Sequence, residues 1–147
     1  MSKTREASLW QWLSKAREPY GERLDIERIE NSIGSGHPDV RLMVEGRHAY
    51  IELKPVARPA RKTTGILVGL RKEQVDWAGR YNTAGGKSCY LLVQVGSGHA
   101  AERYLIDSYH FPFLFENRVD EGWLAEHSYT TKEDGPAVVC TIAAETG

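Results

Sequence analysis

The segment Gly36-His37-Pro38-Asp39 is followed, after twelve intervening residues, by Glu52-Leu53-Lys54, and this pattern could hydrolyse a phosphodiester bond. Carboxylate oxygens are hard ligands that suit Mg²⁺, and a bound Mg²⁺ activates water and stabilises charge on phosphate. Side chains two residues apart on a strand share a face. Lys54 would therefore lie beside a metal held by Asp39 and Glu52. There it could orient or deprotonate the attacking water, or neutralise the phosphate.

The residue between the glutamate and the lysine is expected to play a different part. The Leu53 side chain should enter the core, and its carbonyl should face the site as a further metal ligand. The spacing alone also allows a plainer interpretation, in which Pro38-Asp39 is a turn dipeptide and residues 52–54 are a solvated strand face.

Hydrophobic periodicity predicts elements that would bring the two halves of the motif together. Apolar residues alternate with period two on both sides of Glu45-Gly46, which predicts a hairpin with Asp39 opening one arm and Glu52 near the end of the other. The other expected elements are a helix over about 4–18, a strand near 23–31, a loop over 55–69, a helix over about 70–84, and strands at 89–95, near 102–106 and near 137–143. This order indicates an α/β fold with a mixed sheet flanked by helices.

Length and composition are those of a soluble, intracellular protein with one domain. The 147 residues are 41% hydrophobic and 27% charged, and no segment approaches the roughly 20 apolar residues of a membrane span. The N-terminus does not look like a signal peptide, so a cytoplasmic location is expected. Cys89 and Cys140 lie in apolar runs and are expected to be buried thiols, not a disulfide.

Charge is divided into zones along the chain. From Leu53 to Lys72 there are six basic residues and no acid, whereas from Glu116 onward there are seven acids and two bases. Basic side chains supply most non-specific affinity for nucleic acid. We therefore expect the loop at 55–69 to face phosphate and the acidic C-terminal quarter to face away from it.

Taken together, the glycine before Pro-Asp, the hairpin, the apolar neighbours of Glu52, the basic loop and Gln74-x-x-Trp77 resemble the PD-(D/E)XK nuclease superfamily. The similarity is greatest to its VRR-NUC and phage or archaeal Holliday-junction-resolvase-like branches, and it covers roughly residues 6–95. It implies a restriction-endonuclease-like core, α-β-β-β-α-β, at about 4–106. Residues 107–147 would be an elaboration to which no role is assigned.

The resemblance also implies roles for individual residues. The metal would be Mg²⁺, for which Mn²⁺ can substitute. The implied site consists of the metal ligands Asp39 and Glu52, an acid from the first helix (Glu6 or, less well placed, Glu18), the catalytic lysine Lys54, and the helix glutamine Gln74.

Several neighbours of the motif could contact DNA or extend the site, although each could equally be an ordinary surface residue. The candidates for phosphate contact are Arg58, Arg61 and Lys62, with Arg28 and Arg71 as weaker ones and His37 as a contact to phosphate or water. Glu30 could add a carboxylate.

These observations favour a Mg²⁺-dependent endonuclease that acts on DNA, by analogy on branched DNA such as a junction. Resolvase-like relatives are commonly homodimers, although no dimer surface is legible in the sequence. One alternative is a binding module that keeps the fold without cutting. Another is a phage anti-defence or regulatory protein that acts through its aromatic and acidic C-terminal segment.

Overall fold

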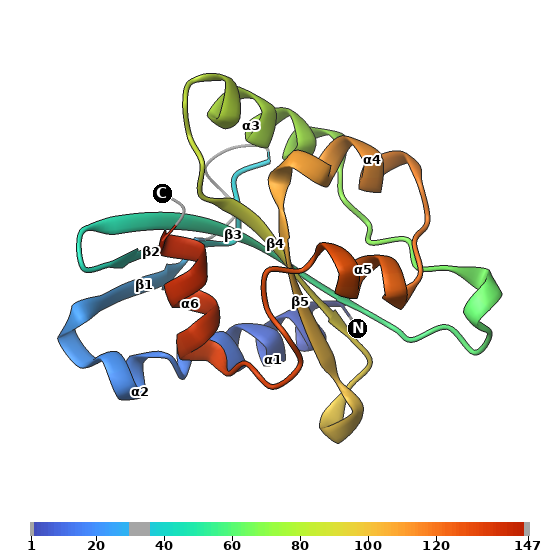
Figure 1. Ribbon diagram of the computed structural model, residues 1–147, viewed down its shortest axis with the longest axis horizontal. Coiled ribbons are helices and arrows are strands. Elements are labelled where there is room, and N and C mark those ends of the chain that lie inside the picture. Colours follow the sequence, from blue (N-terminus) through green and yellow to red (C-terminus); the bar gives the residue numbers. More distant parts are fainter. Residues whose placement is uncertain (1, 30–35, 146–147) are drawn as a thin grey trace.

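A mixed five-stranded sheet forms the centre of the computed structural model, which describes residues 2–29 and 36–145 (Figure 1). The strands lie in the order β1-β2-β3-β4-β5; β3 and β4 are parallel, and all other neighbours are antiparallel. Their bounds are β1 (Leu24–Arg28), β2 (Val40–Val44), β3 (Arg47–Val56), β4 (Cys89–Val95) and β5 (Glu102–Asp107). The parallel pair needs a crossover, which is made by the segment that contains helix α3 (Lys72–Thr83).

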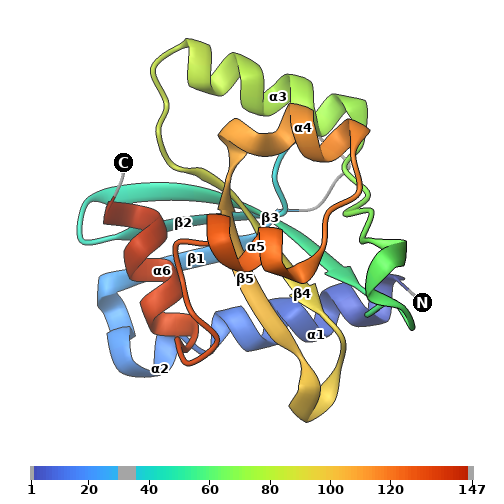
Figure 2. The same cartoon turned by 45° about the vertical axis from the view of Figure 1, so that its right-hand side comes forward.

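Helices cover both faces of the sheet (Figures 1 and 2). The first two helices and the last pack on one face, and the three helices between them pack on the other. Besides α3, the helices are α1 (Ser2–Ser14), α2 (Arg17–Tyr20), α4 (Phe111–Glu116), α5 (Glu121–His127) and α6 (Pro136–Glu145), and the short 3₁₀ turns are η1 (Gly21–Arg23), η2 (Lys62–Thr64), η3 (Gly98–Ala100) and η4 (Ser108–His110). This arrangement confirms the predicted α/β fold. Over the described ranges, no helix has the length and apolar character needed to cross a membrane.

The predicted hairpin is confirmed. Glu45 and Gly46 have φ angles of 48° and 87°, as a tight turn between antiparallel strands requires. Val40 on β2 lies opposite Ile51 on β3, so the start of one arm meets the far part of the other. Asp39, one residue before β2, is thereby brought beside Glu52.

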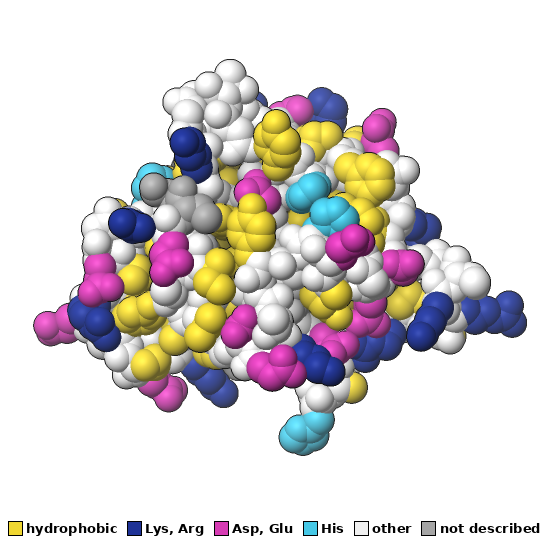
Figure 3. All heavy atoms as spheres, viewed as in Figure 1, with side chains coloured by type: hydrophobic (Ala, Val, Ile, Leu, Met, Phe, Trp, Pro, Cys, Tyr) yellow, Lys and Arg dark blue, Asp and Glu magenta, His cyan; other side chains and the backbone are white. Residues whose placement is uncertain are grey.

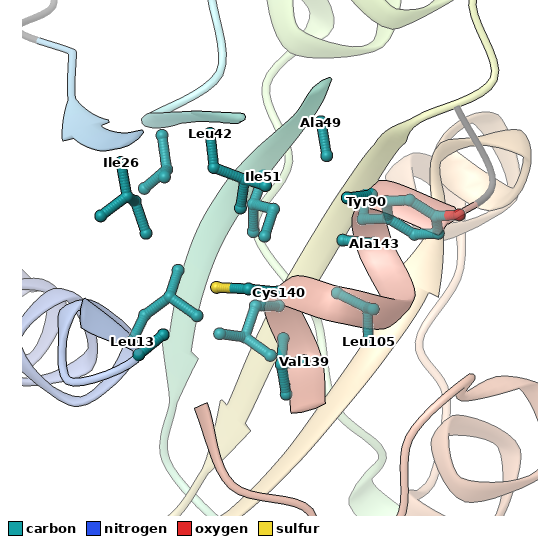
Figure 4. Close-up of a cluster of buried hydrophobic side chains, with 14 of the residues drawn as sticks. Leu13, Ile26, Leu42, Ala49, Ile51, Tyr90, Leu105, Val139, Cys140 and Ala143 are labelled. Atoms are coloured by element: carbon teal, nitrogen blue, oxygen red, sulfur yellow. The ribbon is translucent and has the colours of Figure 1, made fainter. Parts of the chain in front are cut away.

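The apolar layer between the sheet and helices α1 and α6 is closed to solvent (Figure 4). Leu13 on α1 and Val139 and Cys140 on α6 pack against Leu42 and Ile51 of the sheet, and none of the five is more than 1% exposed. Full burial of an aliphatic side chain contributes about 1.5–3 kcal/mol. This face of the sheet therefore serves stability.

The strand expected near residues 137–143 is instead helix α6, so that prediction was wrong. Its buried residues Val139, Cys140 and Ala143 recur at the spacing of one helical face. Pro136 at the first position suits a helix N-terminus, where its missing N–H has no partner to lose. A continuous apolar run has no period of its own, and packing against α1 and the sheet selects the helix.

Other element boundaries differ by a few residues. The first helix ends at Ser14 and the chain then forms the separate helix α2. The first strand ends at Arg28, and the last residues predicted for it lie outside the described ranges. The strands predicted at 89–95 and near 102–106 and the helix predicted at about 70–84 are confirmed as β4, β5 and α3.

Both cysteines are free and buried, as expected. Cys89 belongs to the apolar cluster under α3, α4 and α5, and Cys140 to the cluster on the opposite face. Burial raises the pKa of each thiol to about 12. Neither thiol is therefore a nucleophile at neutral pH.

Both edges of the sheet are partly covered. At the β5 edge, the Tyr129 amide donates to the Leu105 carbonyl at 2.9 Å, and the Leu105 amide donates to the Ser128 hydroxyl at 2.9 Å. At the β1 edge, Arg17 donates to the Ile26 carbonyl at 2.8 Å. Side chains and loop backbone thus form hydrogen bonds with N–H and C=O groups of the edge strands that could otherwise pair with a strand of another molecule.

Candidate active site

The hairpin brings the carboxyl groups of Asp39 and Glu52 together in a buried place. Asp39 is 8% exposed and Glu52 is 1% exposed. The Leu53 amide donates to Asp39 Oδ2 at 2.9 Å, which fixes the aspartate against β3. Glu52 shares a hydrogen bond with Asp39, but its Oε1 atom is buried and has no partner among the described residues.

Burial makes this carboxyl pair electrostatically unusual. Burial first, then the hydrogen bond to Asp39 and its negative charge, raise the pKa of Glu52 well above the usual value, while the Lys54 ammonium lowers it. Two neighbouring carboxyl groups that share a proton are stable in the absence of a cation. A divalent cation could take the place of that proton.

Lys54 lies on the same face of β3 as Glu52, as the period of two predicts. Its Nζ atom donates to the Gly69 carbonyl at 3.2 Å. One N–H is thereby used to hold the ammonium in place. The other two can donate to a substrate oxygen.

The donor set at this site fits a hard divalent cation. No group of three or more His, Cys, Asp or Glu side chains able to hold a metal occurs within residues 2–29 and 36–145. The groups that could hold a cation here are the carboxylates of Asp39 and Glu52, including the unpartnered Oε1 atom. In a strand the N–H and C=O of one residue point to the same side, so the Leu53 carbonyl lies on the Asp39 side of β3, and its role as a metal ligand stays a prediction. Mg²⁺ commonly keeps several waters besides one or two carboxylates.

Of the two candidate acids from the first predicted helix, Glu6 is the one near the pair. Its negative charge contributes to the raised pKa of Glu52. However, Glu6 Oε1 is 2.7 Å from Arg28 Nη2 in an ion pair. Arg28, a weaker candidate for phosphate contact, thus has a partner within the protein. Glu18 is exposed on α2, which packs against β1 and α6. The role of Glu6 as a ligand stays a prediction.

Gly36 allows the motif to lie directly against the start of α3. Its φ is +83°, and an added Cβ would lie 2.0 Å from the Glu73 carbonyl oxygen. Next to it, the His37 ring packs 5.2 Å from Trp77 and 5.8 Å from Tyr50, measured between ring centroids. The glycine and the half-buried histidine thus hold the segment that contains Asp39 against α3.

Gln74 is 3% exposed and caps helix α3. Its Oε1 accepts a hydrogen bond from the Arg71 amide at 2.8 Å. Arg71 itself is exposed, with Nη1 3.4 Å from Glu73 Oε2. The described contacts of Gln74 are those of a helix cap beside the site.

The predicted DNA-contacting cations fall into two groups. Arg61 and Lys62 are exposed at and beside η2. Figure 3 shows Lys and Arg side chains that project from the end of the molecule where the segment around residue 60 lies in Figure 1. Arg58, in contrast, forms ion pairs with Glu121 at 2.7 Å and Glu102 at 3.4 Å. Glu30, a weaker candidate for the site, lies outside the described residues.

Sequence reasoning did not identify two contacts that shape the site. The Gly69 carbonyl holds Lys54, and Arg28 holds Glu6. A backbone acceptor in an irregular loop leaves no signal in the residue types. The Glu6–Arg28 pair joins residues 22 positions apart and carried no pattern of spacing that would single it out.

No protein-family model matches the sequence, and no curated protein matches it. Among solved structures, the fold is similar to that of Hjc, a Holliday junction resolvase from the hyperthermophilic archaeon Archaeoglobus fulgidus, with a TM-score of 0.55. The match covers 94% of this chain and 98% of the other at 16% sequence identity. The likeness is one of fold, and it includes part of the C-terminal segment that the sequence resemblance did not reach.

Proposed function

We propose that this protein is a metal-dependent endonuclease that hydrolyses phosphodiester bonds in branched DNA. The observation that carries the proposal is the buried Asp39–Glu52 pair with its unpartnered Glu52 oxygen, next to Lys54 on the same strand face. The resolvase-like fold supports branched DNA as the substrate class.

In this mechanism Asp39, Glu52 and the Leu53 carbonyl would hold Mg²⁺ or Mn²⁺. The cation, when bound, supplies an activated water and a positive charge at the scissile phosphate. Lys54, held by Gly69, donates an N–H to the attacking water or to a phosphate oxygen and stabilises the negative charge that develops there. Arg61 and Lys62 contact the DNA backbone and set the salt dependence of binding.

The proposal is tested by cleavage of a labelled panel of linear duplex, single strand, flap and four-way junction, with Mg²⁺, Mn²⁺ or EDTA. Asp39→Asn and Lys54→Met should each abolish metal-dependent cutting and leave junction binding in EDTA intact. The matched controls Asp25→Asn and Lys72→Met remove the same charges from exposed ion pairs and should cut normally.

The outcomes separate the alternatives. Cutting of the junction in preference to the linear duplex supports the substrate class. Binding without cutting of any substrate would instead favour a binding module on this fold. Cutting that persists in Asp39→Asn would remove the carboxylate pair from the reaction.

A further inference from the structure

Arg58, the first arginine of the basic loop, is surrounded by hydrogen-bond acceptors from distant parts of the chain. Its Nε donates to Glu121 Oε1 at 2.7 Å, and its Nη2 lies 3.4 Å from Glu102 Oε1. Nη1 donates to the Ala100 carbonyl at 3.1 Å, and Nη2 donates to the Val95 carbonyl at 3.4 Å. The charge of this guanidinium is thus matched within the protein.

The surroundings are shaped for that guanidinium. Gly96 has a φ of +82°, and an added Cβ would lie 2.9 Å from Arg58 Nη1, so glycine leaves the room that the arginine fills. The Tyr104 hydroxyl donates to Glu121 Oε2 at 3.0 Å and holds the second oxygen of the acid. The hydrogen bond between Arg58 and Glu121 raises the pKa of the arginine and lowers that of the glutamate, so both shifts favour the charged pair.

A second contact joins the same loop to the C-terminal segment through the backbone. Ile66 and Val119 exchange both of their hydrogen bonds, at 2.6 and 2.9 Å, in an isolated antiparallel bridge. Ile66, Val68 and Leu70 alternate as buried residues, and they belong to the apolar cluster that α4 and α5 help to form. The C-terminal segment therefore contacts the loop at two places, Arg58 and Ile66.

The stretch held at Ile66 leads directly to the proposed catalytic lysine. Gly69, three residues after Ile66, supplies the carbonyl that accepts from Lys54 Nζ at 3.2 Å. Displacement of the loop at Ile66 would therefore move the acceptor that fixes the lysine. A misplacement of about 1 Å can reduce a rate about 100-fold.

We propose that Arg58, Glu121 and the Ile66–Val119 bridge are positioning residues that hold the Lys54 ammonium for the reaction, and that Arg58 is not a DNA contact. This inference rests on the proposed function. It gives part of the segment after residue 107 a role in the reaction, and it leaves phosphate contact in the loop to Arg61 and Lys62.

Glu121→Gln distinguishes the two roles of Arg58 by the sign of its effect. If Arg58 bound DNA, its release from Glu121 would strengthen binding of a junction. Under the positioning role, the single-turnover cleavage rate falls about ten-fold, while the Kd for the junction in EDTA stays within two-fold. Arg58→Gln should give the same result, and the double variant should lose no more than either single one.

Glu126→Gln is the matched control, because it removes the same charge from an exposed position on α5; its rate and Kd should equal those of the wild type. Amide hydrogen exchange at Ile66 and Val119 should become faster in Glu121→Gln and stay unchanged in the control.

Tighter junction binding by Glu121→Gln with an unchanged rate would overturn this inference and leave the proposed function standing. A wild-type protein that binds the junction and never cuts it would overturn both. Weaker junction binding by Arg58→Gln alone would return Arg58 to the DNA interface.

Discussion

Ile51 and Glu52 are neighbours on β3 with almost equal burial, at 0% and 1% exposure, yet they face opposite sides of the sheet and differ in the contacts they make there. Ile51 enters the apolar layer under α1 and α6, where it belongs to a cluster of buried hydrophobic side chains. Glu52 points to the other face, where its carboxyl meets a second acid and leaves one oxygen without a partner. Burial alone therefore does not separate a core position from a candidate active-site position, whereas hydrogen-bond satisfaction does.

The two residues have opposite effects on the stability of the fold. A buried polar atom without a partner costs about 1–3 kcal/mol, so Glu52 lowers stability where Ile51 raises it. Residues that break the rules of a stable core concentrate at functional sites. The unpartnered oxygen of Glu52 therefore supports the proposal that this carboxyl binds a cation.

The largest expected effect comes from Glu52→Gln, which keeps the shape of the side chain and removes its charge. Cleavage should fall about 1,000-fold, equivalent to about 4 kcal/mol of transition-state stabilisation. The free energy of unfolding in EDTA at neutral pH should rise by about 1 kcal/mol, because folding no longer has to desolvate or protonate this carboxylate. Single-turnover cleavage and urea unfolding measure the two effects. A variant that loses stability together with activity would contradict the contrast with Ile51.

Ile51→Ala should give the reverse pattern. The free energy of unfolding should fall by about 3 kcal/mol, because a cavity opens in a closed layer. Cleavage per folded molecule should change less than two-fold at a temperature where the variant remains folded. Val138→Ala, at a position 42% exposed on α6, is the control and should alter stability by less than about 0.5 kcal/mol. A large loss of cleavage by folded Ile51→Ala would show that the two faces are not independent.

Gly36→Ala tests how the site face is fixed in place. The substitution combines a φ of +83° with a backbone contact at 2.0 Å, and it should cost about 2 kcal/mol and reduce cleavage as the Asp39 segment shifts. Gly46→Ala is the matched control, because its φ is +87° but an added Cβ would meet nothing within 4 Å. It should cost about 1 kcal/mol and leave cleavage per folded molecule unchanged. Equal effects of the two variants would mean that the contact with α3 does not position Asp39.

The smallest effect concerns pH. Burial first and then Asp39 raise the folded-state pKa of Glu52 above its value in the unfolded chain. Such a group contributes stability that is fully present below the unfolded pKa of about 4.3 and is lost as pH rises toward the folded value. In EDTA, unfolding free energy relative to that of Glu52→Gln should therefore decline as the pH increases above about 4.3. Parallel pH profiles of the two proteins would rule out a raised pKa.

Local patterns in the sequence were sufficient for the elements that position the site. The run at 89–95 is long enough for one strand and is apolar on both faces except at Gln94, so β4 appears over the predicted residues. The Glu45-Gly46 turn is determined by residues next to it. The run at 137–143 is equally apolar, but its conformation depends on packing against α1, which local pattern does not contain.

Long-range pairing explains what the sequence left open in the candidate site. The basic character of the loop is legible in its composition, but the partners of Arg58 lie 44 and 63 positions away at Glu102 and Glu121. An acidic C-terminal segment was expected to avoid phosphate, and one of its acids instead forms an ion pair inside the basic loop. The contact between Lys54 and the Gly69 carbonyl could not be predicted either, because every residue has a backbone carbonyl and the residue type carries no signal for it.

The partly covered edges of the sheet restrict how copies of this protein can associate. A new strand would have to displace the Tyr129 and Ser128 contacts at β5 or the Arg17 contact at β1, and β1 offers only five residues. Continuous intermolecular sheets, including fibrils built by edge-to-edge addition, are therefore disfavoured in the folded state.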